Sequence, residues 1–275
     1  MTVRPTLIFS HANGFPGGSY RTFLEPFSAH FELEVVDRIG HTPQFPVDQG
    51  WIGPSRELEA LMEPLPKPLV GMGHSLGGVL TFMVAHRRPE WFSALVMLDP
   101  PLVNGWQGAL FNLGRRLGMI DRVSPAGRSL GRRAHWPDWA EVEGYFNRRP
   151  FFQRLDPRCL ADYLDAGLEE GADGWRLRYA PATEVDIFRT TPGDIGRLAP
   201  LRGVPGLVVS GASSEPAFRQ CALRHVRRHG MVHRMAPGGH MFPLEQPAAA
   251  SAIILEALLP MLEGATDANF GGTAG

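Results

Sequence analysis

A serine between two glycines is the residue of this sequence with the clearest chemistry. The segment Gly-His-Ser-Leu-Gly-Gly places Ser75 two residues from Gly73 and two residues from Gly77. An apolar run over residues 68–73 predicts a strand before the serine, and residues 76–86 predict a buried helix after it. A strand-to-helix turn of this kind needs small residues on both sides, because larger side chains would clash. The pattern therefore predicts a nucleophile elbow that presents Ser75.

A base must accompany this serine, because a serine hydroxyl is a weak nucleophile until its proton is removed. Where a serine stands on such an elbow, the acid and then the histidine follow it in chain order. His240 lies in a Pro-Gly-Gly-His-Met-Phe segment between a predicted strand over residues 231–235 and a predicted helix over residues 247–262. The glycines allow a loop that brings the imidazole over the elbow, so we predict His240 as the base. The competing histidines accompany several arginines and are expected to face solvent: His225, His229 and His233.

A carboxylate is needed to hold the histidine in the right tautomer and to stabilise its positive form. Glu215 follows the predicted strand over residues 206–210 and lies in a suitable loop. Asp99 ends the predicted strand over residues 94–98, the strand that follows the elbow helix. Each residue also has an ordinary structural use, Glu215 at a helix start and Asp99 in a turn before two prolines. We predict Glu215 as the acid and keep Asp99 as the alternative.

Two backbone N–H groups are expected to hold the negative oxygen of a tetrahedral intermediate. One belongs to Leu76, directly after Ser75, at the positive end of the predicted helix. The other is expected from the loop after the first predicted strand, which reads Ser-His-Ala-Asn-Gly-Phe-Pro-Gly-Gly. His11 in this loop is expected to orient the backbone through hydrogen bonds. The sequence leaves three donors open in the loop: Asn13, Gly14 and Phe15.

The elements that must position these residues follow from the hydrophobic pattern. Apolar runs bounded by glycine and proline alternate with helical patterns, which predicts an α/β fold with a mostly parallel sheet flanked by helices. The predicted strands cover residues 6–9, 34–37, 68–73, 94–98, 206–210 and 231–235. The alternation stops between residues 104 and 197, where helical patterns predict a cap inserted after the strand that follows the elbow helix. Residues 1–103 and 198–265 then form the core, and residues 266–275 a flexible tail.

The sequence resembles the α/β-hydrolase superfamily, in its bacterial cap-bearing branch of serine hydrolases and esterases. The resemblance rests on the His-Ala-Asn-Gly-Phe-Pro loop, the Gly-His-Ser-Leu-Gly-Gly elbow and the Gly-Gly-His motif, and it covers residues 5–102 and 204–262. It implies a triad of Ser75, Glu215 and His240, no cofactor, and a helical cap that bounds an acyl pocket. The sequence departs from the family in three features: Ala12 where many relatives carry glycine, a glutamate where aspartate is the commoner acid, and a start that leaves out the first strands of the full fold.

Composition limits the other roles that this chain could have. Its 275 residues carry a net charge of −1, with 44% hydrophobic and 20% charged residues, as in an ordinary globular domain. This balance gives no field that would recruit nucleic acid or a membrane surface. Cys159 and Cys221 are too far apart to suggest a metal site, and no segment reads as a signal peptide or a bilayer-spanning helix. We expect a cytoplasmic protein without nucleic-acid, membrane or metal partners, and we leave a homodimer open.

The predicted cap carries residues that could meet a substrate. Residues 115–133 contain six arginines and one acid, Asp121, which fits attraction of an anionic substrate or, as we expect, a solvated helical face. The aromatic residues of the cap fit an acyl site or, more commonly, the cap's own core: Trp106, Trp136, Trp139, Phe146, Phe151 and Phe152.

The expected function is hydrolysis of a small or medium, largely apolar carboxylic ester through an acyl-enzyme. The same triad and cap fit C–C bond hydrolysis of ring-fission products, thioester or amide cleavage, and perhydrolysis, since these reactions differ in substrate contacts and share the core motifs. A ligand-binding protein on the same scaffold is the non-enzymatic alternative.

Overall fold

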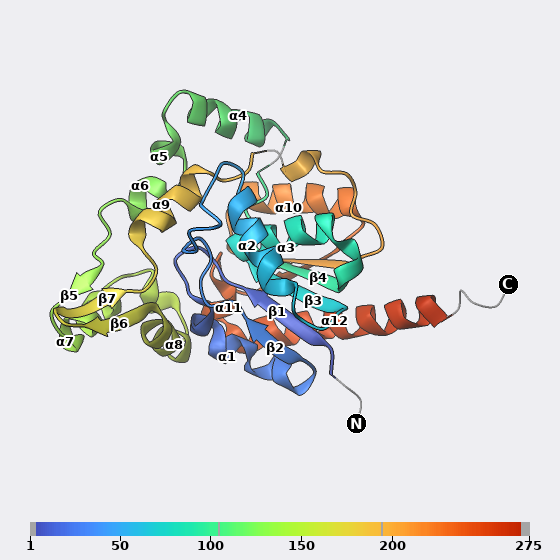
Figure 1. Cartoon of the computed structure of the whole chain (residues 1–275), viewed down its shortest axis with the longest axis horizontal. Coiled ribbons are helices and arrows are strands. Elements are labelled where there is room, and N and C mark those ends of the chain that lie inside the picture. Colours follow the sequence, from blue (N-terminus) through green and yellow to red (C-terminus); the bar gives the residue numbers. More distant parts are fainter. Residues whose placement is uncertain (1–3, 104, 194, 271–275) are drawn as a thin grey trace.

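Six strands form one sheet at the centre of the molecule (Figure 1). The computed structural model describes residues 4–103, 105–193 and 195–270. The strand order is β2-β1-β3-β4-β8-β9, and every neighbouring pair is parallel, which confirms the expected α/β fold. The strands are β1 (Thr6–Ser10), β2 (Glu32–Val35), β3 (Leu69–His74), β4 (Phe92–Leu98), β8 (Gly206–Gly211) and β9 (Val232–Ala236).

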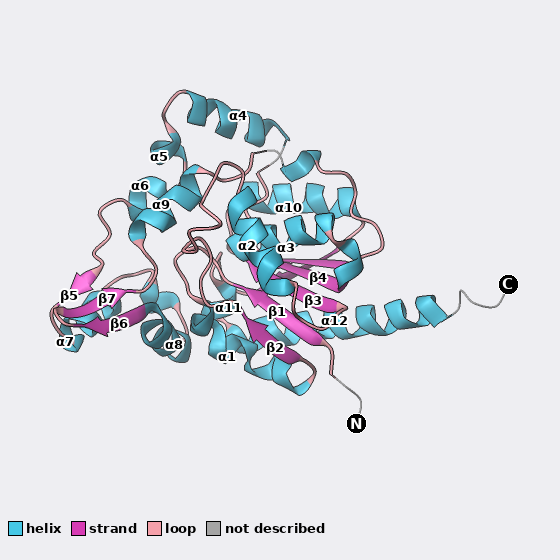
Figure 2. Ribbon diagram, viewed as in Figure 1, coloured by secondary structure: helices cyan, strands magenta, loops and turns pink. Residues whose placement is uncertain are grey.

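The central strands are buried because helices cover both faces of the sheet (Figure 2). Every residue of β1, β3 and β8 is buried, as is every residue of β4 except Ser93. This environment accounts for the continuous apolar runs in the sequence. Successive side chains of β1 enter two different cores, Leu7 and Phe9 on one face and Ile8 on the other.

Each face of the sheet has its own set of helices. The core that contains Phe9 is covered by α1 (Arg21–Leu24), α11 (Phe242–Glu245) and α12 (Pro247–Phe270). The core that contains Ile8 is covered by α2 (Ile52–Met62), α3 (Leu76–Arg87) and α10 (Pro216–His229). Short 3-10 helices complete these connections: η1 (Gly17–Tyr20), η2 (Glu25–Ala29) and η3 (Pro89–Trp91).

The closing helix α12 is longer than expected. Residues 266–270, predicted as part of a flexible tail, continue this helix, and residues 271–275 lie outside the described residues. The 18-residue window Pro247–Gly264 has a mean hydropathy of 1.3, so by length and composition it could cross a membrane. The prediction that no segment meets this criterion is therefore wrong. One side of α12 nonetheless packs on the sheet through the buried Ile254 and Leu258.

The chain between β4 and β8, called the cap below, mixes helices with a small sheet. Its helices are α4 (Gly105–Arg116), α5 (Ile120–Val123), α6 (Ala126–Ser129), α7 (Trp139–Asn147), η4 (Phe152–Arg154), α8 (Pro157–Gly167), α9 (Pro181–Arg189) and η5 (Ile195–Arg197). An antiparallel sheet of order β5-β7-β6 lies among them, from β5 (His135–Trp136), β6 (Leu168–Gly171) and β7 (Gly174–Leu177). The cap is thus mostly helical, with a small antiparallel sheet that the sequence pattern did not indicate.

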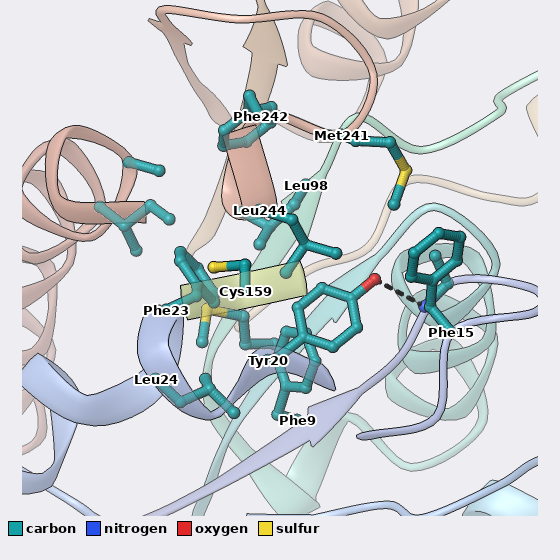
Figure 3. Packing of buried hydrophobic residues seen from close by; sticks show 14 of the residues in the cluster. Phe9, Phe15, Tyr20, Phe23, Leu24, Leu98, Cys159, Met241, Phe242 and Leu244 are labelled. Carbon is teal, nitrogen blue, oxygen red and sulfur yellow. Dashed lines mark hydrogen bonds between the residues drawn. The ribbon is translucent and has the colours of Figure 1, made fainter. Parts of the chain in front are cut away.

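The cap packs on the core mainly through α8, which contacts η1 and α1. Figure 3 shows Cys159 of α8 among the side chains of Tyr20, Phe23 and Leu244, all members of one buried cluster. Cys159 and Cys221 are both buried. This apolar contact fixes the cap beside the loop that follows β1.

Candidate active site

The turn between β3 and α3 holds Ser75 in a left-handed backbone conformation, with φ 52° and ψ −114°. A Cβ on Gly73 would lie 2.3 Å from the carbonyl carbon of Gly77, and a Cβ on Gly77 would lie 2.1 Å from the carbonyl oxygen of Ser10. Both distances are far inside van der Waals contact, so neither position accepts a side chain without a backbone shift. The two glycines therefore make the room for the serine that the sequence pattern predicts.

His240 connects Ser75 to a buried carboxylate. Its Nε2 lies 3.0 Å from Ser75 Oγ, and its Nδ1 lies 2.7 Å from Asp99 Oδ2. Asp99 is 4% exposed, whereas the His240 side chain keeps 39% of its surface exposed. The three side chains thus form a continuous row of serine, histidine and carboxylate, the arrangement of a catalytic triad.

The prediction that Glu215 contacts His240 is wrong, and the alternative residue Asp99 makes this contact. Glu215 is exposed and forms the N-cap of α10, four residues beyond the end of β8. Asp99 follows β4 directly and has a positive φ of 38°, which turns its side chain back over the sheet edge. Because β4 lies next to β3 in the sheet, Asp99 starts closer to the elbow than any residue after β8.

The Asp99 carboxylate has two further partners besides His240. Its Oδ1 accepts the Gly211 N–H over 3.2 Å, and its Oδ2 accepts the Ser214 hydroxyl over 2.9 Å. Both donors come from the loop after β8, the loop in which the acid was expected. That loop supports the carboxylate without supplying it. Sequence reasoning missed Ser214, because a serine near a predicted helix start reads as an ordinary capping residue.

The loop after β1 meets the start of α3, where the Gly77 N–H donates to the His11 carbonyl over 3.1 Å. His11 is buried, and burial lowers its pKa to about 4, so its ring is neutral. Its Nδ1 donates to the Ala12 carbonyl over 2.8 Å, and its Nε2 accepts the Ile39 N–H over 3.0 Å. These contacts agree with the expected orienting role of His11.

The backbone N–H groups of this loop differ in what they bind. Phe15 donates its N–H to the Ala12 carbonyl over 3.0 Å, so the prediction of Phe15 as an open donor is wrong. Of the three predicted donors, Asn13 and Gly14 each have an N–H with no hydrogen-bonded protein acceptor in the described part of the chain. Leu76, the first residue of α3, is at the helix end where N–H groups lack an intrahelical acceptor.

The cap reaches this loop through α9. Glu184 accepts the Asn13 side-chain amide on its backbone carbonyl, over 2.9 Å. Its carboxylate pairs with Arg132 Nη1 over 2.7 Å and accepts the Ser129 hydroxyl over 2.8 Å. Arg132 also donates to the Tyr163 hydroxyl over 2.6 Å. Arg132 is thus largely buried in an ion pair, and the prediction that the cap arginines form a solvated face is wrong for this residue.

The buried cap aromatics belong to the same hydrophobic cluster as Phe9 of β1, so they extend the core on that face of the sheet. Trp136, Phe146 and Phe152 are buried, whereas Phe151 is 37% exposed. Trp139 packs against Trp175 with ring centroids 4.6 Å apart. The side chain of Trp106 lies outside the described residues.

His225 and His229 are buried against α3, so the expectation that they face solvent is wrong. Their rings pack on Phe82 with centroids 4.6 and 5.0 Å away. Neighbouring arginines of α10, such as Arg227 and Arg228, are exposed. A prediction from composition therefore gives no sign that one face of this helix is buried. Burial lowers the pKa of His225 to about 3 and that of His229 to about 4. No group of three or more metal-binding side chains occurs within the described residues.

The fold and this site define a hydrolase. The chain belongs to the alpha/beta hydrolase family, whose model matches residues 7–253. It is 29% identical over 172 residues to the type I acyl-CoA thioesterase mpaH of Penicillium brevicompactum, covering 56% of this chain and 38% of that protein. The chain therefore spans well under half the length of that relative. It is 27% identical over 201 residues to the lipase LipV of Mycobacterium tuberculosis, covering 70% of this chain and 69% of LipV.

Solved structures share the whole fold. An E-2-(acetamidomethylene)succinate hydrolase superposes with a TM-score of 0.72 at 18% identity, covering 92% of this chain and 90% of its own. The peroxisomal α/β-hydrolase Lpx1 of Saccharomyces cerevisiae superposes with a TM-score of 0.70 at 17% identity, covering 94% of this chain and 77% of its own. At this identity the likeness concerns the fold alone.

Proposed function

We propose that this hydrolase cleaves carboxylic esters through an acyl-enzyme, with Ser75 as nucleophile, His240 as base and Asp99 as the carboxylate that orients the base. The observation that carries the proposal is the pair of contacts made by His240, 3.0 Å to Ser75 Oγ and 2.7 Å to Asp99 Oδ2. Asp99 replaces Glu215 in the role first predicted from the sequence.

The direction of proton transfer follows from these contacts. A carboxylate only accepts hydrogen bonds, so Asp99 holds the imidazole proton on Nδ1 and leaves the Nε2 lone pair facing the Ser75 hydroxyl. His240 takes the hydroxyl proton as Ser75 Oγ bonds to the substrate carbonyl carbon. It then returns that proton to the leaving alcohol as the tetrahedral intermediate collapses to the acyl-enzyme. Water, deprotonated by the same imidazole, releases the carboxylic acid and restores Ser75.

The negative oxygen of the intermediate needs donors that are not already occupied. We assign Leu76 N–H and one N–H of the loop after β1, that of Asn13 or Gly14, because the Ala12 and Phe15 N–H groups already have protein acceptors. The N-terminal end of α3 adds its positive dipole at the same point. Removal of one donor from such a pair typically costs a factor of about 10² to 10³ in kcat.

A thioester is the second candidate substrate class. The similarity to the type I acyl-CoA thioesterase mpaH of Penicillium brevicompactum, which covers 56% of this chain, favours a thioester. The similarity to the lipase LipV favours a carboxylic ester. Either substrate passes through the same acyl-enzyme, and the two differ in the leaving group. An apolar acyl chain agrees with the buried Phe15 and Met241, which lie beside the Asn13 loop and His240 in sequence.

The test compares active-site labelling with turnover. Purified protein is treated with a fluorophosphonate probe, and its hydrolysis of p-nitrophenyl esters of graded acyl length is measured beside that of an acyl-CoA. Wild type should be labelled on Ser75 and should hydrolyse at least one of these substrates. Ser75→Ala should lose labelling and at least about 10³ in kcat. The matched control is Ser28→Ala, at an exposed serine that bonds the Glu25 carbonyl, and it should behave as wild type. An unlabelled, inactive wild type would favour a ligand-binding protein on this scaffold.

A further inference from the structure

A second set of hydrogen bonds lies beside the Ser75, His240 and Asp99 contacts and touches none of the reacting atoms. Through Nε2 the His74 ring lies 2.8 Å from the carbonyl oxygen of His240, and through Nδ1 it lies 2.7 Å from the Tyr20 hydroxyl. The Ala12 N–H donates to the same hydroxyl over 3.2 Å, the contact drawn as a dashed line in Figure 3. His74 and Tyr20 are fully buried. These three bonds, called the buried chain below, run without a break from His240 to Ala12.

Only one arrangement of protons satisfies the buried chain. A carbonyl oxygen accepts and never donates, so His74 Nε2 carries a proton for His240. Burial, aided by the nearby His240, lowers the pKa of His74 to about 3, so the ring is neutral and Nδ1 is an acceptor. Tyr20 must then donate its hydroxyl proton to His74, and its oxygen lone pair receives the Ala12 N–H. Each polar group has its partner, as burial requires.

Each end of the buried chain adjoins a group that the proposed reaction uses. His74 precedes Ser75 in sequence, Ala12 precedes Asn13, and the carbonyl that His74 binds belongs to His240 itself. Three segments far apart in sequence are thereby tied together: the loop after β1, the elbow and the loop after β9. We propose that Tyr20 and His74 are positioning residues that fix the base and the N–H donor of the loop after β1 relative to Ser75. This inference rests on the proposed function, because it assigns these residues to that reaction.

The hydroxyl of Tyr20 can be removed with little change in packing. Its ring packs on Phe9 with centroids 4.7 Å apart and on Phe23 with centroids 6.5 Å apart. Tyr20→Phe keeps both contacts and deletes only the oxygen, which leaves His74 Nδ1 without a donor and Ala12 N–H without an acceptor. Tyr145→Phe makes the same chemical change on α7 of the cap, where the ring packs on Trp136, and serves as the matched control.

The experiment measures kcat and KM for the best ester in wild type and in five variants: Tyr20→Phe, His74→Gln, His74→Leu, Tyr20→Phe combined with His74→Gln (the double variant), and Tyr145→Phe. We expect Tyr20→Phe to lower kcat about 10- to 100-fold with KM within about twofold, because small misplacements of reacting groups act on the chemical step. His74→Gln keeps a side-chain N–H for the His240 carbonyl and loses the acceptor for Tyr20, so it should lose less kcat than His74→Leu. The double variant should lose less than the product of its two single losses, because both changes break the same bond.

Nitrogen-15 spectra of the histidine rings give a readout that a merely structural role would not move. Wild type should show His74 with a protonated Nε2 and an unprotonated Nδ1 from about pH 5 to pH 8, and Tyr20→Phe should shift the Nδ1 resonance. A kcat for Tyr20→Phe equal to that of Tyr145→Phe, or independent losses in the double variant, would overturn the positioning role. If His74→Leu does not fold, the kcat values of Tyr20→Phe and His74→Gln still test the positioning role. Failure of the proposed function is seen separately, as a wild type that the fluorophosphonate does not label.

Discussion

The choice between Asp99 and Glu215 as the carboxylate partner of His240 leads to a sharp prediction for Asp99→Asn. Asp99 accepts hydrogen bonds from Gly211 N–H, Ser214 Oγ–H and His240 Nδ1–H, over 3.2, 2.9 and 2.7 Å. An asparagine that keeps its carbonyl on Gly211 turns its NH₂ toward the other two partners. The Ser214 hydroxyl can rotate and accept, whereas the imidazole can accept only if its proton moves from Nδ1 to Nε2.

That proton would then point at Ser75 Oγ, 3.0 Å away, and His240 could no longer act as a base toward it. The loss of this tautomer is worth about 10⁴ in kcat in serine proteases with the same arrangement. A factor of 10⁴ corresponds to about 5.4 kcal/mol of transition-state stabilisation. We therefore expect Asp99→Asn to lose about 10³ to 10⁴ in kcat, with smaller changes in KM. Glu215→Gln changes an exposed helix-capping residue and should stay within about twofold of wild type.

Both variants are assayed on the best p-nitrophenyl ester at one pH, about pH 8. Thermal unfolding is recorded for each, so that a folding defect is not mistaken for a catalytic one. A loss of more than about 10² in Glu215→Gln, together with less than about tenfold in Asp99→Asn, would refute the assignment.

Three further predictions concern stability. Gly77→Ala should unfold the protein or lower its free energy of unfolding by more than about 3 kcal/mol, because the alanine Cβ would lie 2.1 Å from the carbonyl oxygen of Ser10. The control is Gly264→Ala on α12, where a Cβ would have no atom within 4 Å, and it should be neutral or slightly stabilising. Thermal unfolding of both variants measures the difference. Since the pKa values of His225 and His229 are lowered to about 3 and about 4, the unfolded chain takes up protons below about pH 6.5 that the folded chain does not. Urea unfolding should therefore show stability constant above about pH 6.5 and falling as the pH drops toward 4, by about 1 kcal/mol per pH unit for each histidine. His225→Leu should reduce the slope of stability against pH by the contribution of one proton. It should not destabilise the protein at about pH 8, because neither ring nitrogen of His225 has a hydrogen-bond partner within the described residues. An unchanged slope would contradict the claim that burial keeps His225 unprotonated.

The parts of the site that the sequence predicts are those set by neighbours along the chain. The strand, the serine, the two glycines and the helix of the elbow are contiguous in sequence, so the residue types alone predict the geometry of the turn. His240 is also found locally, from glycines in a loop between two elements. Asp99 and Glu215 cannot be ranked this way, because both follow strands. The choice between the two carboxylates depends on which strand lies beside β3 and on a positive φ at Asp99, and the hydrophobic pattern of the sequence predicts neither.

Other features escape prediction because their partners are distant or their signal is mixed. Tyr20 and His74 are 54 positions apart and meet only in the folded chain. The strands β6 and β7 carry two glutamates and one arginine between Leu168 and Leu177, which are paired across the hairpin, so the hydrophobic alternation is short and weak. His225 and His229 show that a helix rich in arginine can still bury one face, since positions four residues apart share a side.

The position of the cap in the chain has a consequence for how this enzyme could change. A crossover between parallel strands needs only a dozen or so residues, and here the β4–β8 crossover has been enlarged into the whole cap. The sheet register from Leu95 to Leu98 against Gly206 to Val209 does not depend on the length of that excursion. Ser75, Asp99 and His240 all lie outside it. Substitutions, insertions or exchange within residues 105–193 can therefore reshape the cap, while the three residues proposed to act on the substrate stay on a separate stretch of chain.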